Sequence, residues 1–118
     1  FLVCSGSEAN ELALRIALTV TGQKDVIVLE EGYHGNTQAN IDISPYKHNG
    51  PGGFGAPDWV HEVPMPYLYR GKYQDPINAG NLYADEVKKI FPKAVVRMPN
   101  GYEGVRYDLI DVQFKEIV

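Results

Sequence analysis

The order of apolar and polar positions predicts a strand, a helix and a second strand at the start of the chain. Phe1–Cys4 is a short apolar run that fits a strand, and Ser5-Gly6-Ser7 ends it. Over Glu8–Thr21 apolar residues recur every three or four positions, which is the spacing of a helix with one apolar face. Val26–Leu29 is an unbroken apolar run, typical of a strand covered on both faces. We therefore predict an α/β fold that starts with a parallel βαβ unit.

The pattern is less regular after this unit. Residues 50–57 contain six glycines or prolines in eight positions and forbid regular structure. Residues 64–76, with three prolines and three tyrosines, indicate an extended, ordered loop. For the rest we predict a short helix over 36–43, a strand over 59–63, a helix over 79–91 and a strand over 94–98.

Composition narrows the class of protein. The 118 residues are 44% hydrophobic and 22% charged, as in an ordinary soluble domain. The net charge of −4 gives no electrostatic reason to expect nucleic acid or a membrane as partner. Cys4 is the single cysteine, and no apolar run approaches the roughly 18 residues of a membrane span. We expect a cytoplasmic protein, and the strand-like start at Phe1 indicates a piece of something larger.

The turn Ser5-Gly6-Ser7 is the first candidate site. A helix N-terminus carries unpaired N–H groups and the positive end of the helix dipole, so Gly6 and Ser7 can hold a phosphate there. Ser5 and Glu8 also have the S-x-x-E spacing of a capping box, so helix capping alone can explain both serines. The run fits neither the phosphate-loop nor the dinucleotide-binding motif.

The segment Gly32-Tyr33-His34-Gly35 is the second candidate. It follows the predicted strand Val26–Leu29, at the sheet edge where α/β proteins bind ligands. Tyr33 can face a flat ring attached to the phosphate, and His34 can serve as a base or a ligand, although both also fit a purely structural loop. No H-x-x-x-H or C-x-x-C pattern accompanies His34, so we expect no metal.

These features together resemble a known family. The runs that carry the resemblance are FLVCSGSEANELALR, then Thr21-Gly22, then EGYHGNT. They resemble the class III aminotransferases, which are enzymes dependent on pyridoxal 5′-phosphate (PLP). The runs ISPYK and YRGKY look most like the branch with phosphoethanolamine phospho-lyases.

The resemblance implies a fold and a domain. Residues 1–92 would be part of the PLP-binding large domain of the aspartate-aminotransferase-like fold. Residues 93–118 would be a divergent tail, either of the same domain or unassigned. The complete parent would be a homodimer that acts on a small amine or amino acid.

The resemblance also implies roles for single residues. Gly6 and Ser7 match the family's contacts to the PLP phosphate, and Tyr33 matches the aromatic residue that stacks on the pyridine ring. Ser5, Glu8 and His34 would lie just behind these contacts.

Catalytic residues are expected elsewhere in the parent. The family's Schiff-base lysine comes from a motif far downstream, and its pyridine-pairing aspartate lies in an apolar strand. Asp85 sits in a similar tetrapeptide, but the helical spacing around it predicts a solvated helical face instead. Arg70 and Lys72 are weaker candidates for gripping a substrate phosphate or carboxylate.

Three functions therefore stay open. The parent is expected to be a transaminase, or alternatively a phospho-lyase of the same family. This chain alone would be inactive, and a truncated, non-catalytic module that binds phosphate ligands is a further alternative. An unrelated nucleotide-dependent transferase is disfavoured by the missing phosphate-loop motif.

Overall fold

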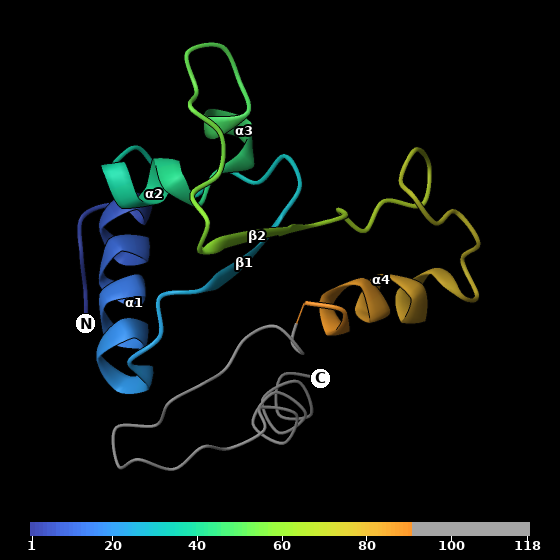
Figure 1. Cartoon of the computed structure of the whole chain (residues 1–118), viewed down its shortest axis with the longest axis horizontal. Helices are drawn as coiled ribbons and strands as arrows, with labels where there is room; N and C mark the ends of the chain where they lie inside the picture. Colours follow the sequence, from blue (N-terminus) through green and yellow to red (C-terminus); the bar gives the residue numbers. More distant parts are fainter. Residues whose placement is uncertain (91–118) are drawn as a thin grey trace.

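The computed structural model describes residues 1–90. The predictions for 93–118, including the strand over 94–98, lie outside the described residues. The elements are α1 (Gly6–Thr21), β1 (Val26–Leu29), α2 (Gln38–Asp42), α3 (Pro45–His48), β2 (Val60–Val63) and α4 (Ala79–Lys88), as Figure 1 shows.

Helix α1 has the ends that the sequence predicts. Ser5 is extended, and its Oγ accepts a hydrogen bond of 3.2 Å from the Glu8 N–H. The Glu8 carboxylate in turn accepts one of 2.6 Å from the Cys4 N–H. Gly22 adopts a left-handed φ of 67° and donates to the Leu18 carbonyl. The first helix is therefore specified by its local sequence at both ends.

The sheet is parallel, but its strands are not the first two that we predicted. β1 pairs with β2, in a register that places Val26 opposite Val60 and Leu29 opposite Val63. The prediction of a strand over Phe1–Cys4 is wrong: these residues form no strand, and Phe1 and Leu2 are fully exposed. A strand needs a neighbour for its N–H and C=O groups, and in residues 1–90 β1 finds that neighbour in β2.

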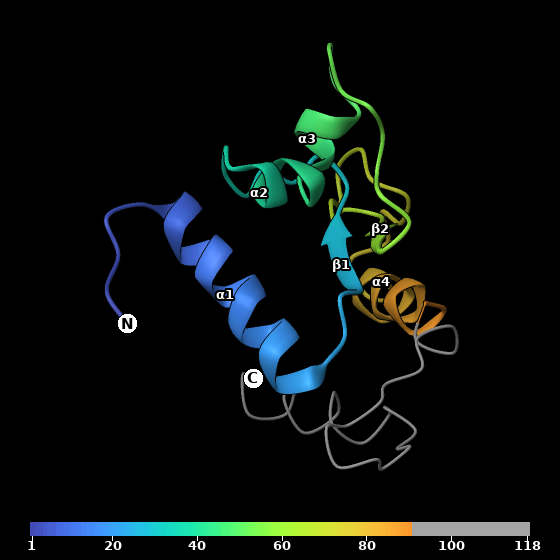
Figure 2. The same ribbon diagram turned by 60° about the vertical axis from the view of Figure 1, so that its left-hand side comes forward.

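The connection between the strands carries α2 and α3 and positions the site. Val28, Ile43 and Val60 form the buried cluster, with Leu14 and Trp59 packed against it. Helix α1 has no fully buried residue. In both ribbon views α2 lies beside the N-terminal end of α1, whereas α4 lies on the other side of the strands (Figure 1, Figure 2).

Most of the remaining predictions agree with the structure. Residues 50–57 form no helix or strand, and 64–76 form a loop that contains a turn at residues 68–70. Helix α3 was not predicted, although Ser44 followed by Pro45 is a readable helix start. Among residues 1–90 no helix has the length and apolar character needed to cross a membrane.

Candidate functional site

The first turn of α1 presents free hydrogen-bond donors. Gly6 and Ser7 are the first two residues of the helix, so their N–H groups have no acceptor within it. Ser5, the cap residue, accepts hydrogen bonds from residues further along the helix: its Oγ accepts from the Glu8 N–H and its carbonyl from the Ala9 N–H. A Cβ added at Gly6 would meet nothing within 4 Å. The space beside Gly6 is therefore open, and an anion can come close to the backbone there.

Ser7 is fixed from the side by the loop after β1. Its Oγ accepts a 3.2 Å hydrogen bond from the Asn36 N–H, which leaves the hydroxyl hydrogen for another acceptor. Gly35 lies directly against it with a φ of 134°, and a Cβ there would sit 2.6 Å from Ser7 Oγ. Only glycine allows this approach. The loop and the helix start thus form one unit.

Tyr33 lies in the same loop with its ring exposed. The exposed fraction of the residue is 55%. Its ring meets Tyr46 edge-on, with centroids 6.3 Å apart and planes at 81°. Lys47 Nζ lies 5.7 Å from the centroid of the Tyr33 ring. The backbone is anchored by the 3.2 Å hydrogen bond from the Tyr46 N–H to the Gly32 carbonyl. These contacts hold the ring while leaving much of it accessible.

His34 bonds through its backbone to α1 and to Ser44. Its N–H donates to Ser44 Oγ at 2.8 Å, and its carbonyl accepts from Asn10 Nδ2 at 2.7 Å. Its Nε2 is buried and has no hydrogen-bond partner within the described residues. Across residues 1–90 no group of three or more potential ligands could hold a metal ion. Through its backbone hydrogen bonds, His34 connects α1 to the loop that carries Tyr33.

The sequence patterns did not predict two residues of the site. Asn40 and Ser44 are both completely buried polar residues of the α2 region. Asn40 Nδ2 donates to the Ser7 carbonyl at 2.8 Å, and Ser44 Oγ donates to the Asn40 carbonyl. The sequence feature that could have indicated their burial is their spacing of four, because it places both on the same side of a helix as the apolar Ile43.

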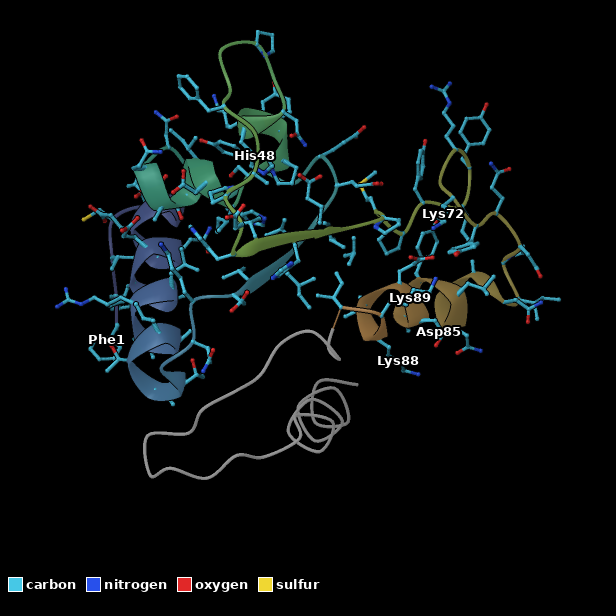
Figure 3. The ribbon with its side chains drawn as sticks, in the orientation of Figure 1. Phe1, His48, Lys72, Asp85, Lys88 and Lys89 are labelled. Carbon is cyan, nitrogen blue, oxygen red and sulfur yellow. The ribbon has the colours of Figure 1, made fainter. Side chains whose placement is uncertain are left out.

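The basic candidates of the tyrosine-rich loop lie elsewhere. Lys72 Nζ is 2.8 Å from Glu86 Oε1 on α4, and Lys89 is 3.0 Å from the same oxygen (Figure 3). Hydrogen bonds from Lys72, Tyr73 and Lys89 lower the pKa of Glu86 to about 2, and the bond to Glu86 raises the pKa of Lys72. Lys72 therefore holds the loop on α4. This pairing argues against the role of Lys72 in gripping a substrate.

Asp85 is placed as the helical spacing predicts. It lies on α4, its side chain is 56% exposed, and it forms a 3.4 Å ion pair with Lys88 (Figure 3). Arg70 lies over the ring of Tyr69, with its guanidinium carbon 5.2 Å from the ring centroid. The partners of these two residues lie on α4 and in the tyrosine-rich loop, and not in the first turn of α1.

Comparison with known proteins identifies similar sequences. The chain is 46% identical over 101 residues to a Drosophila melanogaster protein named alanine–glyoxylate aminotransferase 2-like, a match that covers 82% of the chain. The resemblance to the class III aminotransferases is confirmed. The chain is also 44% identical over 96 residues, or 73% of its length, to ethanolamine-phosphate phospho-lyase homolog 1 of Caenorhabditis elegans. No model of a protein family matches the chain.

A solved structure supports the fold. An amine transaminase from an uncultivated Pseudomonas species, in its PLP-bound form, matches 77% of this chain with a TM-score of 0.61 at 23% identity. The α/β fold of a PLP-dependent transaminase is thereby confirmed. The match covers 22% of that structure, and the chain spans about a fifth of the length of the two curated relatives.

Proposed function

We propose that this chain supplies part of the PLP site of a class III aminotransferase. Gly6 and Ser7 bind the cofactor phosphate, and Tyr33 stacks on the cofactor ring. The observation that carries the proposal is the first turn of α1. Its N–H groups are free, and its Ser7 Oγ accepts a hydrogen bond from Asn36, in the loop that follows the exposed Tyr33. The 46% identity to an aminotransferase-like relative also supports the proposal.

The residues present fit a phosphate ester with a flat ring. Two backbone N–H groups, the Ser7 hydroxyl and the helix dipole all favour an anion at this end of α1. Ser5 and Glu8 cap the helix, so their role is to keep these donors in place. When bound, PLP supplies an electron sink, while the protein supplies orientation and electrostatics.

The rest of the reaction belongs to the complete protein. The chain contributes binding groups, and the catalytic lysine and the aspartate that pairs with the cofactor nitrogen come from parts beyond it. Residues 1–92 belong to the large domain of a cytoplasmic homodimer that acts on a small amine or amino acid. Size-exclusion chromatography with light scattering and cell fractionation of the complete protein test the assembly and the compartment.

Variants of the complete protein test the site. Stacking contributes about 0.5–1.5 kcal/mol beyond the burial of the ring, so Tyr33→Ala should raise the Kd for PLP about tenfold, whereas Tyr33→Phe should bind almost normally. Ser7→Ala removes a hydrogen bond to a charged group worth about 1.5–3 kcal/mol and should raise Kd by about tenfold or more. Normal PLP binding by Tyr33→Ala would mean that Tyr33 is a structural loop residue.

A second function has its own support. The identity of 44% to a phospho-lyase homolog favours elimination of phosphate from an amino-alcohol phosphate. The complete enzyme should be incubated with phosphoethanolamine, and with an amino acid plus a 2-oxo acid. Phosphate release in the first assay and none of the transamination product in the second would select the lyase; the reverse result selects the transaminase.

A further inference from the structure

Asn40 holds the first turn of α1 from inside the protein. Its side chain is completely buried, and its Nδ2 donates to the carbonyl of Ser7 at 2.8 Å. The Ser7 hydroxyl is engaged from the other side by the Asn36 N–H at 3.2 Å. The orientation of Ser7 is therefore set at two atoms, both by residues of the β1–α2 segment.

Asn40 is itself held at its backbone. The Ser44 hydroxyl donates to the Asn40 carbonyl and accepts from the His34 N–H at 2.8 Å. This chain of contacts leads from Ser7 to the residue next to Tyr33. Both ribbon views place α2 beside the start of α1, and the Asn40–Ser7 bond joins the two helices (Figure 1, Figure 2).

Burying the side-chain amide of Asn40 at this position lowers the stability of the fold. Its Oδ1 is buried and has no partner within residues 1–90. A buried acceptor without a partner destabilises a fold, and an apolar residue of similar size would avoid that cost. The amide is therefore explained by the bond that its other atom makes to Ser7.

We infer that Asn40 is a positioning residue for the cofactor phosphate. Its role is indirect: the bond fixes the carbonyl of Ser7, and this holds the N–H and hydroxyl groups of Ser7 in the orientation that one anion requires. This inference rests on the proposed function, because it assumes that Ser7 binds the phosphate of PLP.

The test uses the complete enzyme with Asn40→Leu, which keeps the size and removes the donor. Its Kd for PLP should rise about fivefold, as expected for the loss of a hydrogen bond that orients a ligand contact. The phosphorus-31 resonance of bound PLP should shift, because the donors around the phosphate move. Gln38→Leu, on the same helix but exposed and bonded to Asp42, is the control and should change neither quantity.

The outcomes separate the two claims. A lower unfolding temperature of the Asn40→Leu apoenzyme, with unchanged Kd and unchanged phosphorus resonance, would make Asn40 merely structural and overturn the inference. If Ser7→Ala also binds PLP normally, the proposed phosphate site fails as well. Should Asn40→Leu not fold, Asn40→Ser, whose hydroxyl is too short to reach the Ser7 carbonyl, gives the same two readouts.

Discussion

Gly35→Ala is expected to separate the start of α1 from the loop that carries Tyr33. A Cβ at this position would lie 2.6 Å from Ser7 Oγ, 2.8 Å from Asn40 Nδ2 and 2.9 Å from Ser7 Cα. The last of these is a backbone atom, so rotation of a side chain cannot relieve the clash. The φ of 134° is also one that alanine rarely adopts.

Two costs add up at this position. A non-glycine residue in such a conformation costs about 1–3 kcal/mol, and forcing a methyl group into a filled space costs about 1–3 kcal/mol. Together they come to about 2–6 kcal/mol, against a typical total stability of about 5–15 kcal/mol. The substitution should also weaken PLP binding, because Ser7 is displaced.

The assay is denaturant unfolding of the complete protein, with PLP affinity measured in parallel. Gly80→Ala is the matched control, since a Cβ at Gly80 meets nothing within 4 Å and alanine in a helix stabilises by about 0.5–1 kcal/mol relative to glycine. If Gly35→Ala unfolds at the same denaturant concentration as Gly80→Ala, the close packing of Gly35 on Ser7 is refuted.

Three further predictions concern α4 and the lysines. Tyr83→Phe removes the hydroxyl that accepts the Tyr73 N–H at 3.0 Å and should cost about 1–3 kcal/mol in thermal unfolding, whereas Tyr69→Phe, 71% exposed, should cost almost nothing. Because the pKa of Glu86 in the folded protein is about 2, the stability that Glu86 contributes is present above about pH 4.5 and is lost as pH falls toward 2. Glu86→Gln should reduce the loss of folding stability over this pH range in an acid titration, and Asp85→Asn should not. Treated with PLP and borohydride, this chain alone should give no stoichiometric lysine adduct by mass spectrometry, and one specific adduct would contradict its non-catalytic role.

Local signals in the sequence account for what could be predicted. The limits of α1 follow from Ser5, Glu8 and Gly22, each of which acts within four residues of its partner. The strand Phe1–Cys4 was predicted from apolar character alone. A strand forms only beside another strand, and the pairing of β1 depends on residues 34 positions further along the chain, as the register of Val26 with Val60 shows.

The site was predictable where a motif marks it and not where distant contacts build it. Ser5-Gly6-Ser7 can be identified as a helix start that suits an anion. Asn40 could not be assigned to that site, because its bond to Ser7 joins residues 33 positions apart. The need for glycine at position 35 likewise arises from contacts with Ser7 and Asn40, which only the fold brings together.

The joined helix start and loop have a consequence for protein engineering. Ser7, Asn10 and Glu11 of α1 bond to partners within residues 34–40. A chimera of two relatives with its crossover between residues 12 and 33 would take these partners from different parents. Crossovers before residue 5 or after residue 44 would inherit the whole set from one parent. Recombination libraries built from such enzymes should therefore transfer residues 5–44 as one block.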